Sequence, residues 1–166
     1  PFLSKPPQVM REALRIVSRI GWKDKETTVA WPGRSSDRIN WNGVDLILRA
    51  AHNSESLSHD LGRLGQDRHV LVVGMTQKQD LSETTEPLLL SDCRIQTVVT
   101  EVHGGRTPSV PAGELSKILS GHSEVAPMII EEPIEAVDGA SRLAIEESCI
   151  VYVTGSIYLV GRVVGA

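Results

Sequence analysis

The stretch "LILRAAHNSESLSHDLGRLGQDRHVLVVGM", residues 46–75, decides the fold. It opens with a short apolar run, continues over 54–66 with apolar residues at helical spacing, and ends in an unbroken apolar run over 68–75. Strands that are apolar on both faces are typical of parallel sheets, where a helix carries the chain from one strand to the next. This stretch therefore predicts a strand–helix–strand unit of an α/β protein.

The same alternation continues to the last residue of the chain. The run over 149–166 predicts a strand, a break at Thr154, Gly155 and Ser156, and then an apolar helix start or a returning strand. Ahead of the stretch, Asn42 and Gly43 lie between two strand-like runs and predict a two-residue hairpin. We therefore expect a Rossmann-like α/β fold, with a mostly parallel sheet, helices on both faces and an N-terminal β-hairpin. The other predicted elements are helices over 80–93, 111–122 and 133–148 and strands over 95–102 and 126–132.

Composition and charge argue against several classes of protein. The chain has 166 residues, of which 40% are hydrophobic and 23% charged, as in a single globular domain. Its net charge of -4 argues against a nucleic-acid partner, because binding phosphates needs a basic face. No apolar run reaches the roughly 18 residues of a membrane span, and no signal peptide is visible. We therefore expect a cytoplasmic protein without a membrane partner.

Polar residues follow the predicted strands at their carboxyl ends, where doubly wound sheets bind ligands. His52 and Asn53 follow the first strand of the stretch, and Ser156 follows the last strand of the chain. Each also has a purely structural interpretation. A lone histidine at a strand end is more often a hydrogen-bonded structural residue, and Ser156 could cap the next helix. Ser54 or Ser56 could cap the helix over 54–66 in the same way.

Several common signatures are absent from the sequence. It contains no phosphate loop, no GxGxxG dinucleotide fingerprint, no GxSxG nucleophile elbow and no HExxH motif. Its five histidines do not have metal-ligand spacing, so no metal site is predicted. Local chemistry therefore indicates only an α/β domain with a polar crevice.

The order of several motifs is more specific than any one of them. Together they resemble the C-terminal domain of folylpolyglutamate synthase/dihydrofolate synthase, within the Mur ligase superfamily. That family's pattern is W-P-G-R, then D-G-A-H-N-P, then V-x-G-M-x-x-D-K-D, and finally V-T-G-S-L-Y-L-V-G. The likeness runs from about residue 29 to residue 164. The motifs here are WPGR (31–34), LILRAAHN (46–53), VLVVGMTQKQDL (70–81), TVVTEV (97–102) and VYVTGSIYLVGRVV (151–164).

The resemblance implies an ATP-dependent, amide-bond-forming ligase that joins glutamate to a folate or dihydropteroate acceptor. Residues 29–166 would be its C-terminal domain, and residues 1–28 a helix and linker from the preceding part of a longer chain. The preceding ATPase domain would bind most of the ATP and Mg²⁺. The C-terminal domain would bind glutamate and close over it, positioning the reactants and excluding water. The fragment alone is expected to be inactive.

Five positions match residues to which the family gives a role. Arg34 corresponds to the arginine near the nucleotide phosphates, a catalytic and cofactor-binding position that suits a permanently charged guanidinium. His52 and Asn53 correspond to the pair that faces the cleft, with His52 expected in catalysis and Asn53 in substrate binding. Ser156 corresponds to the serine that helps to hold glutamate. Asp80, the last acid of the D-K-D motif, is expected to contribute to the cofactor site.

Five positions depart from the family pattern. Arg49, Ala50 and Ser54 stand where the family keeps an aspartate, a glycine and a proline, and Lys78 and Gln79 replace the first two residues of D-K-D. An arginine in place of an acid reverses the local charge. The sequence therefore leaves open a non-catalytic ligand-binding or interaction module descended from this family. A cell-wall Mur-type amino-acid ligase is a third hypothesis, although the TGSIYLVG segment is closer to the folate branch.

Overall fold

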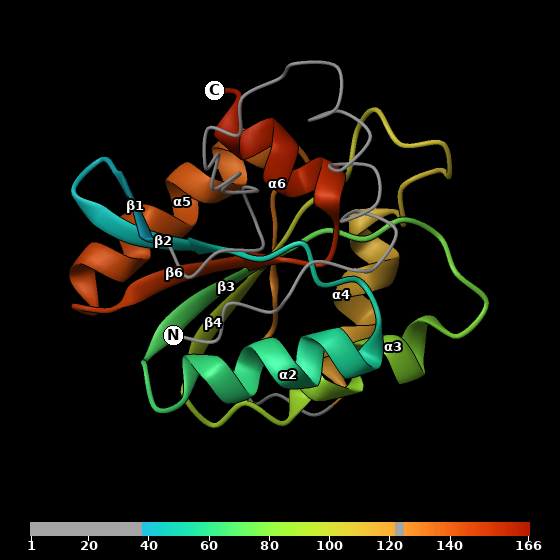
Figure 1. The fold of residues 1–166 in the computed structure, drawn as a ribbon, viewed down its shortest axis with the longest axis horizontal. Coiled ribbons are helices and arrows are strands. Elements are labelled where there is room, and N and C mark those ends of the chain that lie inside the picture. Colours follow the sequence, from blue (N-terminus) through green and yellow to red (C-terminus); the bar gives the residue numbers. More distant parts are fainter. Residues whose placement is uncertain (1–37, 122–124) are drawn as a thin grey trace, which may run out of the picture. The chain divides into compact units, whose positions relative to one another are not determined.

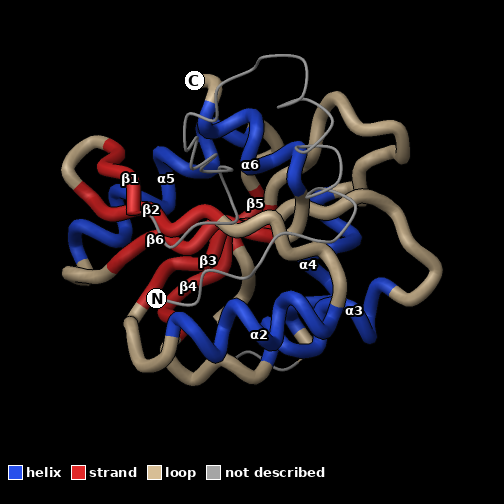
Figure 2. Tube along the Cα trace, viewed as in Figure 1, coloured by secondary structure: helices blue, strands red, loops and turns tan. Residues whose placement is uncertain are grey.

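A computed structural model of the chain describes residues 38–121 and 125–166, and Arg34 lies outside these ranges. Six strands form one sheet in the order β1-β2-β6-β3-β4-β5 (Figure 2). The first two strands are antiparallel, and all other neighbours are parallel. The strands are β1 (Arg38–Trp41), β2 (Val44–Leu48), β3 (His69–Val73), β4 (Arg94–Val99), β5 (Met128–Ile129) and β6 (Ile150–Thr154).

Helices cover both faces of this sheet (Figure 1). One face packs against α2 (Ser54–Leu64), α3 (Leu81–Leu89) and α4 (Ala112–Ser120). The other face packs against α5 (Pro133–Glu146) and α6 (Ile157–Val164). This arrangement confirms the predicted α/β class, the mostly parallel sheet and the helices on both faces. The strand expected over 126–132 is shorter than predicted, with only Met128 and Ile129 in the ladder.

The strands β3 and β6 are almost entirely apolar because both of their faces are buried. In β3, Val70 and Val72 pack on the side of α5 and α6, whereas Leu71 and Val73 pack on the side of α2, α3 and α4. Tyr152 of β6 is also fully buried on the α2 side. Parallel strands covered on both faces leave no position for a solvated side chain, which explains the absence of polar alternation.

Local signals set the hairpin and the start of α2. Asn42 has a φ of 51° and Gly43 a φ of 92°, as the predicted two-residue turn requires. Asn53 is the N-cap of α2, and its side-chain oxygen accepts a hydrogen bond from the Ser56 N–H at 2.8 Å. Ser56 is the third residue of the helix and completes a capping box. The expectation that Ser54 or Ser56 would cap this helix was therefore wrong.

The position of β6 creates the crevices of the sheet. β6 lies between β2 and β3. The chain leaves β2 and β3 toward α2 and α3 on one face, but it leaves β6 toward α6 on the other face. The chain therefore diverges at the carboxyl ends on both sides of β6, which are the switch points where such sheets bind ligands.

His69 makes stability depend on pH. Its Nδ1 lies 2.9 Å from the Asp67 carbonyl oxygen, so this nitrogen carries the proton and donates it. Nε2 is buried without a partner among the described residues. Burial lowers the pKa of His69 from its ordinary value of 6.5, and the Arg94 charge lowers it further, although the Asp67 hydrogen bond opposes the shift. Below pH 6.5 His69 is protonated in the unfolded chain but stays neutral in the folded protein. The free energy of unfolding therefore falls as the pH drops below 6.5.

We expect His69→Gln to remove most of this pH dependence. In the parent protein the free energy of unfolding should fall by at most about 1.4 kcal/mol for each pH unit below the unfolded pKa. Urea unfolding at several pH values between pH 8 and pH 5 measures the slope. His59→Gln changes an exposed histidine on the same side of the sheet and should leave the slope in place. Equal slopes in the parent and His69→Gln would contradict the prediction.

Candidate functional site

Three loops meet at the carboxyl ends of β2, β6 and β3. The Gly155 N–H donates to the Ala51 carbonyl oxygen at 3.0 Å, and the Gly74 N–H donates to the Thr154 carbonyl oxygen at 3.4 Å. Gly155 has a φ of +102°, and a Cβ there would lie 2.6 Å from the Gly74 carbonyl oxygen. A residue without a side chain is thus required for the β6 loop to touch both neighbouring loops.

Ser156 begins α6 from the centre of this junction. Its side chain is buried, and its Oγ accepts a hydrogen bond from the Tyr158 N–H at 3.2 Å. The serine therefore caps the helix, as the structural interpretation of the sequence predicted. An N-cap hydroxyl keeps its own hydrogen and a second lone pair, so capping leaves it able to donate to a carboxylate.

His52 and Asn53 lie on the loop that Gly155 contacts. The His52 Nδ1 is 3.0 Å from the Ala50 carbonyl oxygen, so Nδ1 donates and Nε2 is left as an acceptor. Asn53 uses its side-chain oxygen for the cap of α2, and its amide nitrogen makes no hydrogen bond within the described residues. Both side chains are exposed. The loop therefore offers one proton acceptor and one amide donor to solvent.

The starts of α2 and α6 both lie at this junction. The first turn of a helix carries free N–H groups and a partial positive charge, which favour an anionic group. The hydroxyl of Ser156 and the amide of Asn53 are neutral donors at these two helix starts. Chemically, the junction is suited to hold a carboxylate near a proton acceptor, the His52 Nε2.

The other positions singled out in the sequence lie directly after β2 and after β3. Asp80 is exposed at the start of α3, where its side chain makes no capping hydrogen bond. Lys78 is half-buried, and burial lowers its pKa, whereas Gln79 is exposed. Arg49 is buried beneath α2, where its Nε lies 3.9 Å from Asp60 Oδ1. The Arg49 side chain therefore packs against α2 instead of extending into solvent.

Sequence reasoning missed a set of polar groups on the α2 side of the sheet. His69, Tyr152 and Thr154 are buried there with Arg49, and each has a polar atom without a partner among the described residues. The available signal was a tyrosine and a histidine inside apolar strand runs. Their proximity could not be inferred, because it depends on β6 lying between β2 and β3.

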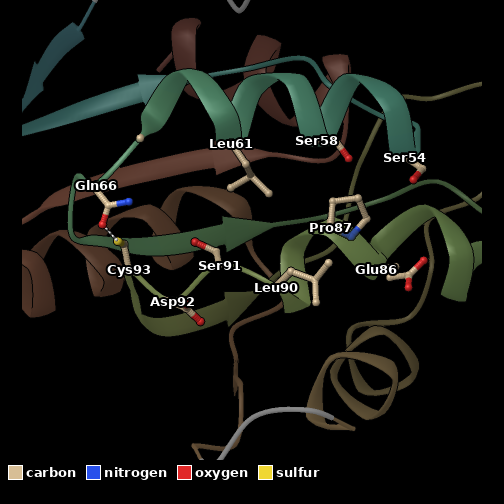
Figure 3. A pocket seen from close by; sticks show the side chains of 11 residues that line it. Ser54, Ser58, Leu61, Gln66, Glu86, Pro87, Leu90, Ser91, Asp92 and Cys93 are labelled. Carbon is tan, nitrogen blue, oxygen red and sulfur yellow. Dashed lines mark hydrogen bonds between the residues drawn. The ribbon is translucent and has the colours of Figure 1, made fainter.

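A separate groove of about 540 Å³ lies between α2 and α3 and the turns that follow them (Figure 3). Leu61 of α2 and Pro87 of α3 face it, and the Cys93 thiol donates to the Gln66 side-chain oxygen at 3.5 Å at one end. None of the residues that the sequence predicted for a site lines this groove. We assign it no function.

The described residues do not fit a bound Mg²⁺. Within 38–121 and 125–166 no three histidine, cysteine, aspartate or glutamate side chains lie close enough together to hold a metal ion. Nor does the sequence contain a phosphate loop. The described residues are therefore given no role in holding a metal ion.

Among residues 38–121 and 125–166, no helix is long and apolar enough to cross a bilayer.

The chain has no match among protein-family models or curated proteins. Solved structures do match. Folylpolyglutamate synthase from Thermotoga maritima has a TM-score of 0.68 at 21% identity, over 92% of this chain and 36% of its own. E. coli FolC in complex with DHPP and ADP has a TM-score of 0.65 at 20% identity, over 92% and 37%.

The bifunctional folylpolyglutamate synthase/dihydrofolate synthase from Yersinia pestis, complexed with AMPPNP and a Mn ion, has a TM-score of 0.62. Its identity is 22%, over 92% of this chain and 37% of its own. This chain therefore spans little more than a third of the length of the synthases it matches. The match covers nearly all of this chain and shows that it has the same fold as part of these synthases.

Proposed function

We propose that this chain is the glutamate-binding, C-terminal domain of a cytoplasmic ATP-dependent ligase of the folylpolyglutamate synthase/dihydrofolate synthase type. The observation that supports this most directly is the fold shared with three such synthases over 92% of the chain. Three of the motifs that suggested the family, those at 46–53, 70–81 and 151–164, lie on β2, β3 and β6 and the loops after them, beside the switch points where a ligand site is expected. In this proposal residues 29–166 are the domain, and residues 1–28 link it to the preceding ATPase domain.

The junction of loops would hold the glutamate substrate. A carboxylate at the starts of α2 and α6 would accept hydrogen bonds from the Asn53 amide and the Ser156 hydroxyl. The His52 Nε2 would then take the proton that the glutamate amine loses as it attacks the carbonyl carbon of the folate acyl phosphate made from ATP, which releases phosphate. Arg34 and Asp80 would face the nucleotide of the ATPase domain, which would bind most of the ATP and Mg²⁺. The acceptor would be a folate or dihydropteroate.

A second candidate is a non-catalytic binding module with the same fold. Arg49, Lys78 and Gln79 favour it, because they replace acidic or basic residues that the active family keeps at matching positions. The two candidates differ in one measurable way. The ligase must be a much longer protein that consumes ATP only when glutamate and a folate acceptor are both present. A cell-wall Mur-type ligase would instead require a different acceptor.

The native gene product tests the proposal. Its intact mass should lie well above the 18.1 kDa of this chain, and it should incorporate glutamate into a folate or dihydropteroate acceptor in an ATP-dependent reaction. A native mass near 18.1 kDa, or no incorporation by the intact product, would refute the ligase and favour the binding module.

Asn53 allows the structural and substrate roles to be separated. Asn53→Asp keeps an oxygen that can accept the Ser56 N–H, but it removes the amide donor and adds a negative charge. We expect Asn53→Asp to keep the stability of the parent within about 0.5 kcal/mol and to lower kcat/KM for glutamate by roughly 10- to 100-fold, equal to about 1.4–2.8 kcal/mol. Asn53→Ala should instead lose about 1 kcal/mol of stability, because the cap is gone.

Chemical denaturation and glutamate kinetics on the two variants check this pair. If Asn53→Asp is stable and as active as the parent, the residue only caps α2 and the substrate role assigned to it is wrong.

A further inference from the structure

A small cavity of about 180 Å³ lies between α2 and the sheet, beside the β1–β2 hairpin. Its volume corresponds to roughly six water molecules, taking about 30 Å³ for each. The sheet contributes Arg38, Ile47, Arg49 and Tyr152, and α2 with the turn that follows it contributes Asp60, Arg63, Leu64 and Asp67. Five charged side chains around so small a space are unusual for a gap that only separates a helix from a sheet.

Two buried polar groups of the wall lack partners. Arg49 is 7% exposed, and its Nη1 is buried without a hydrogen bond among the described residues. The Tyr152 hydroxyl also has no hydrogen bond among the described residues, and its side chain is fully buried. The nearest charged partner of Arg49 is Asp60, and at 3.9 Å from Nε this contact is longer than a hydrogen bond. Leaving a guanidinium N–H and a phenol unpaired is costly, so something polar is expected to fill the cavity.

Tyr152 stays protonated at neutral pH and is therefore a hydrogen-bond donor. Burial raises the pKa of Tyr152 to about 12, and the nearby Asp60 carboxylate raises it too, while Thr154 and Arg49 oppose the rise. No hydrogen bond of normal geometry joins the Tyr152 and Thr154 hydroxyls. At neutral pH the phenol therefore keeps its proton and can donate it to a ligand in the cavity.

The buried guanidinium of Arg49 is only loosely paired within the wall. Asp67 is engaged by Arg38 at 2.8 Å. Asp60 lies 3.9 Å from the Arg49 Nε, and the Arg49 Nη1 has no hydrogen-bond acceptor among the described residues. An anion in the cavity would therefore meet a buried positive charge with a free donor.

We propose that this cavity is a binding site for a small oxyanion, either inorganic phosphate or a carboxylate. The Arg49 Nη1 and the Tyr152 hydroxyl would donate to its oxygens, and its negative charge would lie against the buried Arg49 guanidinium. The site lies under α2, apart from the junction of His52, Asn53 and Ser156, and it does not depend on the ligase proposal. An arginine in place of an aspartate at position 49 is what makes it possible.

Thermal unfolding of the full-length protein with added anions tests the site. At constant ionic strength and pH 7.5, sodium phosphate and sodium acetate are each compared with sodium chloride. We expect at least one oxyanion at about ten times its Kd to raise Tm by roughly 2–6 °C over chloride. A response to phosphate alone identifies a phosphoryl ligand, and a response to acetate identifies a carboxylate. Equal Tm values in all three salts would mean a water-filled cavity and would overturn the proposal.

Two variants assign the response to this cavity. Arg49→Met keeps the length of the side chain but removes the donors, and Tyr152→Phe removes only the buried hydroxyl. Each should lose most of the oxyanion-dependent rise in Tm. Arg68→Met removes an exposed arginine that pairs with Glu147 and should keep the full rise. A full response in Tyr152→Phe would overturn the proposal, even if Arg49→Met does not fold.

Discussion

Replacing Gly155 by alanine should destabilise the protein by roughly 3 kcal/mol and lower Tm by about 6–12 °C. Two effects add in this variant. An alanine must adopt a φ of +102°, and its Cβ would approach the Gly74 carbonyl oxygen to 2.6 Å. Neither partner can move cheaply, because both belong to backbone held at the ends of neighbouring strands β6 and β3. The loops after β2, β6 and β3 should therefore separate, and any activity at the junction should fall with stability.

Gly161→Ala is the matched control for this prediction. Gly161 lies in the middle of α6, and no atom outside its own helix turn lies within 4 Å of the position of a Cβ. An alanine there should raise stability by up to about 1 kcal/mol, since glycine is a poor helix former. Urea unfolding of both variants measures the difference. A Gly155→Ala protein as stable as the parent would show that the three loops do not approach as closely as described.

Arg49→Asp should also be strongly destabilising, although it restores the residue that the ligase family keeps. The new carboxylate would lie in a buried place close to Asp60 and without its cation. Removing one partner of a buried ion pair costs roughly 3 kcal/mol or more. Two carboxylates that share a buried site cannot both stay ionised, so the loss should be smaller at pH 5 than at pH 8. We expect no gain in ligase activity from this substitution.

The same exchange on an exposed arginine provides the control. Arg68→Asp breaks a surface pair with Glu147 and should cost less than about 1 kcal/mol. Adding Asp60→Asn to Arg49→Asp should recover much of the lost stability, because one of the two like charges is gone. Urea unfolding curves of the single and double variants at pH 5 and pH 8 measure both the loss of stability and its recovery. A large gain in ligase activity on Arg49→Asp would instead mean that residue 49 faces the substrate.

Much of the fold was predictable because short-range signals agree with the final packing. The unbroken apolar runs at β3 and β6 reflect burial on both faces, and the Asn42-Gly43 pair supplies the two positive φ angles of the hairpin. The choice of cap for α2 was harder. Asn53, Ser54 and Ser56 are all good capping residues in one short segment, and only the backbone at the end of β2 selects Asn53.

The site was predictable only in part. His52, Asn53 and Ser156 could be assigned to strand ends from sequence, and the structure joins their loops through Gly155. The cavity under α2 could not be foreseen in the same way. Arg49 stands out in the sequence as a reversed charge, but Tyr152 lies far from it along the chain and resembles an ordinary core residue. Only the insertion of β6 beside β2 brings the tyrosine to the arginine.

The place of β6 in the sheet also has a consequence for the order of synthesis. The strand at the centre, between β2 and β3, is the last strand of the sheet to leave the ribosome. Until residues 150–154 are available, β2 and β3 each expose an unpaired inner edge, and these edges can pair with other chains. Long-range strand pairing is also slow to form. A nascent chain that is halted before residue 150 should therefore aggregate, because β2 and β3 cannot form a stable sheet without β6.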